Sequence, residues 1–180
     1  MKKTHADHIE TAFLQLAFAL KLWHFFSSTP PDKEAFDIAL TVNTPGSMVY
    51  LPHGQFERID DLILATENNI NICFGAAAIT LWEALNETGK YKPTKFPTPL
   101  NTQEEKIAAL IYMLRCCFAH GMAIPTWDIR ASKYRIVYKI GNKTIDLTSL
   151  NGQVFSYESI GGYETLWFLR YEVADRGMLK

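Results

Sequence analysis

Apolar residues recur at spacings of three and four over long stretches of the chain, and this periodicity is typical of amphipathic helices. The first stretch covers residues 7–26 and ends at a segment, 27–31, that finishes with two prolines. Proline cannot continue the helical hydrogen-bond ladder. The second stretch covers residues 60–86, and its small residues 75–78 predict the close approach of another helix.

A third helix is predicted to begin after Thr102, which forms a capping-box pattern with Glu105. Gly121 stands in the position of a C-terminal cap and Pro125 follows, so His120 is expected in the last turn. A closing helix is expected over residues 163–173.

Two regions alternate apolar and polar residues with a period of two, as strands do. Residues 36–42 and 48–51 flank a turn and predict one hairpin, with a short helix over residues 32–39 as the alternative. Residues 134–140 and 143–147 predict a second hairpin around Gly141. The sequence therefore predicts a mainly α fold with one or two small β-hairpins, in a single domain over residues 1–180.

Composition bounds the class of protein. Apolar residues make up 48% of the chain, which suits a packed globule. The formal net charge is −1, so any binding of RNA depends on a local basic patch. Three cysteines without CxxC spacing indicate reduced thiols, and no cofactor or metal site is expected.

We expect a cytoplasmic protein with no membrane span, because the start lacks a signal-peptide pattern and charges interrupt the apolar runs.

Arg115 and His120 stand near the end of the third helix and are the candidates for catalysis. An imidazole ordinarily titrates at about 6.5, which suits proton transfer to and from ribose and phosphate oxygens. A guanidinium can hold a phosphate in its fork. On an ideal helix the two side chains point about 140° apart, so sharing a face requires an irregular last turn. Taken alone, this spacing more often belongs to helix caps or surface contacts.

The segment from Arg115 to His120 has the RxxxxH pattern of the HEPN superfamily, and Ala119-His120-Gly121 resembles its frequent ending. Residues 127–130, 145–152 and 161–162 resemble the C-terminal half of bacterial HEPN-like proteins, and residues 68–75 resemble the same group. The similarity covers about two-thirds of the chain.

This resemblance implies a helical bundle, usually a homodimer, in which Arg115 and His120 face a cleft between subunits. It implies a metal-independent endoribonuclease or an RNA-binding protein, in toxin–antitoxin or phage-defence systems, with no DNA expected as ligand. Cys116 occupies the position where the family commonly has Asn, Asp or His, and we expect it near the substrate.

Further residues are candidates for substrate binding. Glu67, Asn68 and Asn71 form a polar run inside the second helix and could line the cleft. One predicted strand face carries Lys133, Arg135 and Lys139, and Arg130 lies near it. These cations could supply the basic patch that binds RNA. For both groups, a solvated surface is the simpler explanation.

Two other functions remain open. One is a catalytically inactive HEPN scaffold that binds an antitoxin or another partner protein, which Cys116 favours. The other is a small-molecule-binding helical bundle, indicated by the many aromatic residues and expected to use Trp23, Phe74 and Trp82.

Overall fold

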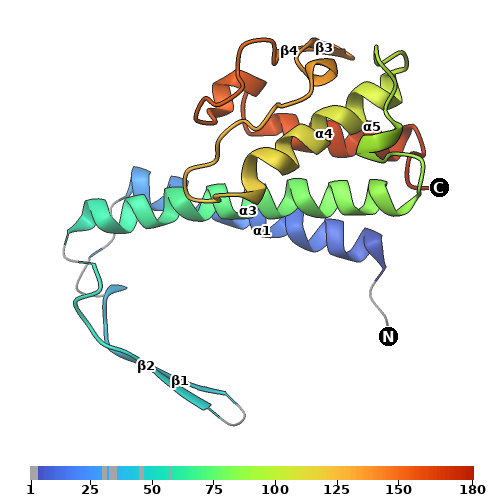
Figure 1. Cartoon of the computed structure of the whole chain (residues 1–180). Coiled ribbons are helices and arrows are strands. Elements are labelled where there is room, and N and C mark those ends of the chain that lie inside the picture. The colour runs from blue at the N-terminus through green and yellow to red at the C-terminus, as the bar shows by residue number, and fades with distance from the viewer. Residues whose placement is uncertain (1–3, 30–31, 33–35, 45–46, 57) are drawn as a thin grey trace. The chain divides into compact units, whose positions relative to one another are not determined.

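The fold is described from a computed structural model that covers residues 4–29, 32, 36–44, 47–56 and 58–180. The chain is mainly helical (Figure 1). The α-helices are α1 (His5–Ser28), α3 (Ile59–Glu87), α4 (Gln103–Ala119) and α5 (Glu164–Asp175). The strands are β1 (Leu40–Thr44), β2 (Ser47–Leu51), β3 (Val137–Ile140) and β4 (Lys143–Asp146). Three 3₁₀ turns are η1 (Pro93–Lys95), η2 (Ser132–Tyr134) and η3 (Tyr157–Ile160).

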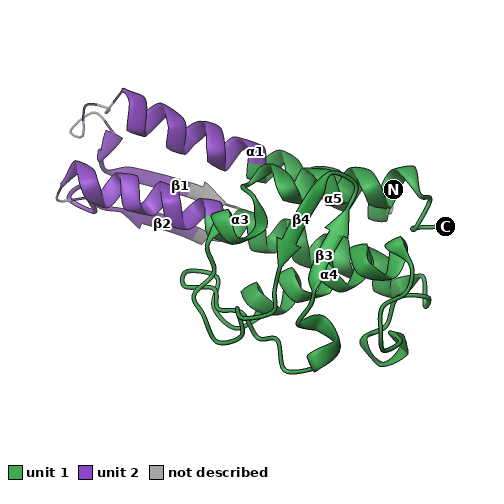
Figure 2. Cartoon of the chain, turned by 90° about the horizontal axis from the view of Figure 1, so that it is seen from above, with its two compact units in different colours: residues 1–16, 71–180 green, residues 17–70 purple. Residues whose placement is uncertain are grey.

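The chain divides into two compact units, coloured separately in Figure 2. Unit 1 comprises residues 1–16 and 71–180, and unit 2 comprises residues 17–70. The long helices α1 and α3 contribute residues to both. The expectation of a single domain over residues 1–180 stays a prediction.

Helix α4 forms the core of unit 1 and packs against α5 and strand β3. It is buried almost throughout its length from Ile107 to Phe118. A Cβ atom added at Gly75 of α3 would lie 2.8 Å from a ring carbon of Phe118, so the glycine permits this close contact between α3 and α4. The predicted role of the small residues in the second helix is therefore confirmed.

Aromatic side chains fill the space around this contact. The Phe74 ring lies 5.4 Å from the Phe118 ring and 5.2 Å from the Tyr157 ring, and Trp82 lies 4.8 Å from Tyr112. Rings at such separations contribute to packing beyond their buried area. Phe74 and Trp82 thus belong to the core of unit 1.

The N-terminal end of α4 has the predicted cap, and the C-terminal end differs from the prediction. Thr102 accepts a hydrogen bond from the Glu105 amide at 3.1 Å, and the Glu105 carboxylate accepts one from the Thr102 amide at 3.0 Å. The predicted capping box is confirmed. The expected glycine cap is wrong: His120 itself is the C-cap in a right-handed conformation, and Gly121 has no positive φ.

The second hairpin, β3–β4, begins later than predicted. Residues 132–134 form the turn η2, and the strand starts at Val137. Tyr138 is fully buried, and its hydroxyl donates to the Tyr134 carbonyl at 3.2 Å. The hairpin therefore presents one buried face to α4 and one exposed face to solvent.

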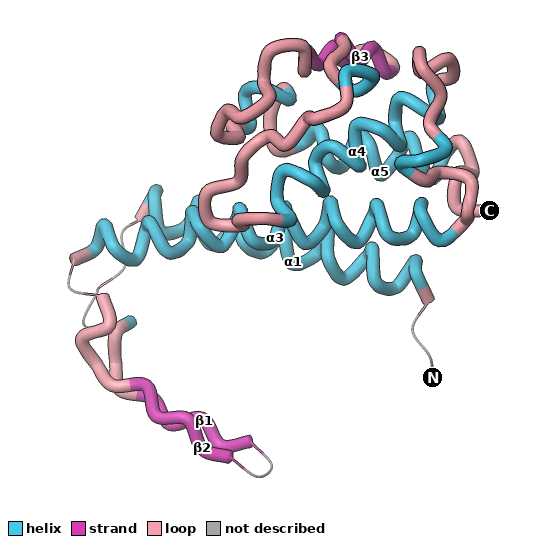
Figure 3. Tube along the Cα trace, viewed as in Figure 1, coloured by secondary structure: helices cyan, strands magenta, loops and turns pink. Residues whose placement is uncertain are grey.

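Unit 2 contains the first hairpin, which confirms the predicted β1–β2 pairing (Figure 3). The Asp37 carboxylate accepts hydrogen bonds from the amides of Gly54, Gln55 and Phe56 at 2.9–3.2 Å, which ties the two ends of the hairpin together. The alternative helix over residues 32–39 includes residues 33–35, which lie outside the described residues, so it stays a prediction.

Helix α3 is long and apolar enough to cross a membrane, which the sequence analysis did not expect. In unit 1 its apolar residues form the core instead, because Phe74, Ala77, Leu81 and Leu85 are buried there. Helix α3 therefore has the length and composition of a membrane span, while its C-terminal part packs in the core of unit 1.

Candidate functional site

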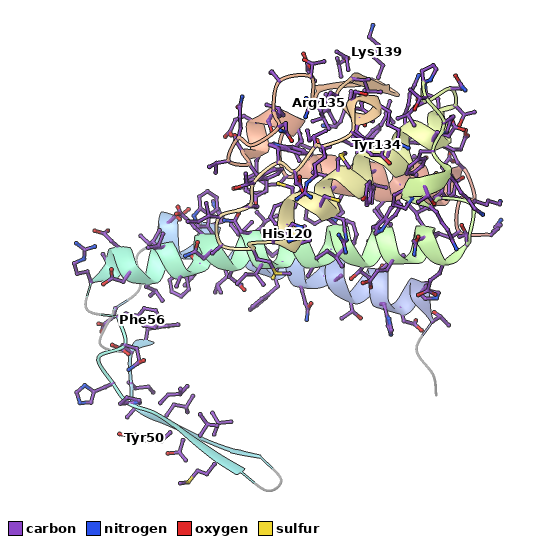
Figure 4. The ribbon with its side chains drawn as sticks, viewed as in Figure 1. Tyr50, Phe56, His120, Tyr134, Arg135 and Lys139 are labelled. Carbon is purple, nitrogen blue, oxygen red and sulfur yellow. The ribbon has the colours of Figure 1, made fainter. Side chains whose placement is uncertain are left out.

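A partly open cavity of about 380 Å³ lies at the C-terminal end of α4, within unit 1. Its polar lining comes from His120, Thr126, Asp128, Arg130 and Asn151. Figure 4 labels His120, which stands where α4 ends and the following loop begins. The cavity is therefore built by the end of a core helix and by residues far from it in sequence.

The walls of the cavity form because two distant segments pair. The Trp127 amide donates to the Gln153 carbonyl at 2.9 Å, and the Gly152 amide donates to the Trp127 carbonyl at 2.7 Å. The Asn151 side chain accepts from the Ile129 amide at 2.8 Å. Gly152 has a φ of +80°, a conformation that glycine adopts without strain. The turn at 151–152 is thus a structural part of the cavity.

His120 is exposed and has no hydrogen-bond partner among the residues that the structure describes. An imidazole in this position can accept a proton through one ring nitrogen or donate one when protonated.

Arg130 lies on the same cavity and is held by Asp128. Its Nε donates to Asp128 Oδ1 at 2.8 Å, and the side chains are 84% and 29% exposed. An ion pair this exposed contributes little stability. The bond orients the guanidinium and leaves its two terminal nitrogens for a ligand.

Trp127 closes the inner side of the cavity. Its side chain is buried, with the ring 5.5 Å from Phe155, and its indole Nε1 lacks a hydrogen-bond partner within the described part of the chain.

Cys117 also lines the cavity, but burial raises the pKa of its thiol to about 12. This thiol is therefore protonated at neutral pH and a poor nucleophile.

Arg115 does not line this cavity. Helix α4 is a regular α-helix through Ala119, so the spacing of five residues keeps Arg115 and His120 on different sides of it. Arg115 is half-buried and lies near Tyr112. Within one chain the structure does not bring the two predicted catalytic side chains together.

Cys116 is buried beside Tyr112 and does not line the cavity. Burial and a hydrogen bond with Cys116 raise the pKa of Tyr112 to about 12. Cys116 therefore belongs to the aromatic core, and within one chain it is not placed to touch a substrate.

No protein-family model, curated protein or solved structure matches this chain significantly. The resemblance to the HEPN superfamily accordingly stays a prediction.

The polar run of α3 is engaged within the protein. The Trp23 indole donates to the Glu67 carboxylate at 3.3 Å, inside unit 2. The Tyr157 hydroxyl donates to Asn71 Oδ1 at 2.6 Å, inside unit 1, and burial raises the pKa of that hydroxyl. Asn68 is half-buried. None of Glu67, Asn68 and Asn71 lines the cavity.

The predicted basic strand face is wrong, because Lys133 and Arg135 precede strand β3. The Lys133 ammonium donates to the carbonyls of Pro93 and Phe96 at 3.1 and 3.0 Å and lies 5.2 Å from the Tyr134 ring. Arg135 donates to the Ile129 carbonyl at 2.9 Å. Lys139 is exposed on strand β3, and its side chain is labelled in Figure 4. Of the three predicted substrate-binding cations, Arg130 is the one that lines the cavity.

Sequence reasoning did not single out Thr126, Asp128 or Asn151 as site residues. They follow from the pairing of segments 125–129 and 151–155, which a local pattern does not reveal. Among the described residues, no group of three His, Cys, Asp or Glu side chains could hold a metal ion.

Proposed function

We propose that this protein binds RNA and cleaves it as a metal-independent endoribonuclease, with His120 as the acid–base group and Arg130 as the phosphate-binding group. The observation that supports this is the shared cavity: an exposed imidazole and an exposed guanidinium line the same hollow. A cavity of about 380 Å³ falls within the usual range for small-ligand sites, about 300–1,000 Å³, and suits a single nucleotide.

The chemistry needs no redox partner and no metal ligand. The ribose 2′-oxygen forms a bond to phosphorus while His120 takes the hydroxyl proton, and the bond from phosphorus to the 5′-oxygen breaks. The departing 5′-oxygen takes a proton from an imidazolium or from water. The products are a 2′,3′-cyclic phosphate and a 5′-hydroxyl, so protons and electrons balance.

Arg130 would stabilise the charge that develops on the phosphate oxygens. Its bond to Asp128 fixes one edge of the guanidinium, so the terminal nitrogens can bind phosphate without first being ordered.

Arg115 keeps a separate predicted role. Because it lies off the cavity, the proposal does not require it to touch the phosphate that His120 acts on. If the cleft of a homodimer forms as the family resemblance implies, Arg115 of each copy would act there, and its substitution reports on that prediction.

The test is RNA cleavage by the full chain in EDTA, compared across matched variants. His120→Ala should lower the cleavage rate at least about 100-fold, because general acid–base groups contribute about that much. Arg130→Ala should weaken RNA binding about tenfold, because it removes a charged hydrogen-bond donor. His8→Ala, an exposed histidine on α1 and away from the cavity, should change neither. Full activity of His120→Ala with an unchanged melting temperature would disprove the assignment.

A second candidate function is a partner-binding scaffold without catalysis, such as one held by an antitoxin. Asp128 favours it, because a carboxylate beside the cavity opposes the entry of a phosphate. Growth after induced expression separates the two. Toxicity that is lost with His120→Ala supports the nuclease, and harmless overproduction supports the scaffold.

A further inference from the structure

A second cavity, of about 210 Å³, lies within unit 1 and is lined by residues of α1, α3 and α5. Its apolar wall is formed by Ile9, Leu81 and Val173, one from each helix, and all three are buried. Ala174 and Leu179 also line it and are exposed, so the cavity opens to solvent on their side. An apolar cavity of about 150 Å³ can hold a benzene molecule. The second cavity therefore has room for a short aliphatic chain.

Glu10 and Arg170 are the polar residues among those that line this cavity in the described part of the chain, and they form an ion pair. Arg170 Nη2 donates to the Glu10 carboxylate. The Arg170 guanidinium also lies over the Phe13 ring, with its central carbon 4.8 Å from the ring centroid. The Arg170 side chain is 33% exposed and that of Glu10 is 54% exposed. The guanidinium is thus held by two contacts, whereas the more exposed carboxylate is held by one.

This difference determines which charge stays at the second cavity when a ligand enters. An exposed ion pair contributes little stability, so a second carboxylate can replace that of Glu10 at small cost. Glu10 can then turn into solvent, while the contact with the Phe13 ring keeps Arg170 in place. A guanidinium binds a carboxylate in its planar fork. The cavity thus combines apolar walls with one fixed cation, the usual composition of a small-molecule site.

We propose that the second cavity binds a small aliphatic carboxylate. Its chain lies against Ile9, Leu81 and Val173, and its carboxylate takes the place of Glu10 on Arg170. Burial of the chain supplies affinity, and the guanidinium selects the anion over an alcohol or an amine. No residue lines both this cavity and the one at the end of α4. The proposal is therefore independent of the proposed ribonuclease activity.

An NMR titration of the isotope-labelled full chain with octanoate tests the proposal. Octanoate should shift the amide signals of residues that line the second cavity, and these shifts should saturate. 1-Octanol has a chain of the same length without a charge, and octylamine carries the opposite charge. Both should bind at least about tenfold more weakly, because a charge-assisted hydrogen bond is lost. Acetate lacks the chain and should show no saturable binding.

Two substitutions in the ion pair should act in opposite directions. Arg170→Gln removes the cation and should weaken octanoate binding at least about tenfold. Glu10→Gln keeps an acceptor for Arg170 and removes the competing negative charge. It should strengthen octanoate binding about two- to fivefold, the range expected for an exposed ion pair.

Ala174→Phe places a ring at the open side of the second cavity and should abolish octanoate binding. Ala131→Phe makes the same substitution at an exposed site that does not line the cavity, and should change nothing. The amide spectrum of each variant without ligand shows that the fold is kept. Octanoate shifts that do not saturate, or equal binding of 1-octanol, overturn the proposal. So does tighter binding of octylamine, or weaker octanoate binding by Glu10→Gln, because either result assigns the ligand to Glu10.

Discussion

The two hairpins of this chain have the same topology and opposite surroundings. In β3–β4, Tyr138, Ile140 and Ile145 are buried, while Lys139 and Asp146 face solvent. In β1–β2, every side chain described is exposed, and the strands carry no charge. The contrast shows that an alternation of apolar and polar residues predicts a strand. It does not predict whether the apolar face of that strand packs against another part of the chain.

Charged side chains on a strand indicate which of its faces is exposed to solvent. Lys139 and Asp146 mark the solvent face of β3–β4, so the alternate residues are assigned to the core. The first hairpin has no such marker, because both of its faces lack charge.

The largest expected difference between the hairpins is in stability. Tyr138→Ala should lower the free energy of unfolding by about 3–5 kcal/mol, because a fully buried aromatic ring is lost. Tyr50→Ala should change it by less than about 0.5 kcal/mol, because that ring is largely exposed. Urea denaturation at a low protein concentration measures both. Equal losses would mean that the two hairpins do not differ as described.

A substitution that removes a charge from the exposed face of β3–β4 makes this hairpin resemble β1–β2. Lys139→Ile removes the ammonium from the exposed face and leaves an apolar side chain there. We expect a change in unfolding free energy within about 0.5 kcal/mol and a measurable increase in self-association by light scattering. Lys139→Gln removes the charge without adding an apolar surface and is the control. Identical scattering from both variants would argue against the role given to the charge.

The smallest expected effect concerns the end of β4. The Asp146 carboxylate accepts hydrogen bonds from the Thr148 amide at 2.8 Å and hydroxyl at 2.6 Å, and these bonds lower its pKa. A lowered pKa in the folded state stabilises the fold above the unfolded value, about 3.9 for Asp, and this contribution disappears as the pH falls through the folded value.

Thr148→Ala should therefore lower the melting temperature slightly at about pH 6 and by less at about pH 2, because the Asp146 carboxyl gains a proton as the pH falls through its folded-state pKa. Thr144→Ala, at an exposed site on β4, controls for strand propensity and should have the same effect at both pH values. A Thr148→Ala deficit that is equal at both pH values would show that the hydroxyl acts through something other than the carboxylate.

Local patterns predicted the helices and both hairpins, because apolar stripes, the capping box of Thr102 and the turn at Gly141 act over a few residues. The cavity was not predictable in this way. Asn151 bonds to an amide 22 residues away, and Lys133 bonds to carbonyls 37 and 40 residues away. These contacts decide that Arg130 reaches the cavity and that Lys133 does not.

The motif that resembles the HEPN superfamily illustrates the same limit. Helix geometry alone predicts that Arg115 and His120 diverge, and in α4 they do. The resemblance led to the expectation that the two would meet in a cleft. That cleft would lie between two subunits, so it stays a prediction. Within one chain, Arg130 lines the same cavity as His120, through a loop whose path depends on pairing with residues 151–155.

The most direct test of the account compares RNA and DNA of one sequence, incubated with the full chain in EDTA. We predict that the RNA is cut to 2′,3′-cyclic phosphate ends, that the DNA stays intact because it lacks the 2′-hydroxyl, and that His120→Ala leaves both intact. RNA that survives the wild-type protein, or that is cut equally by His120→Ala, would contradict it.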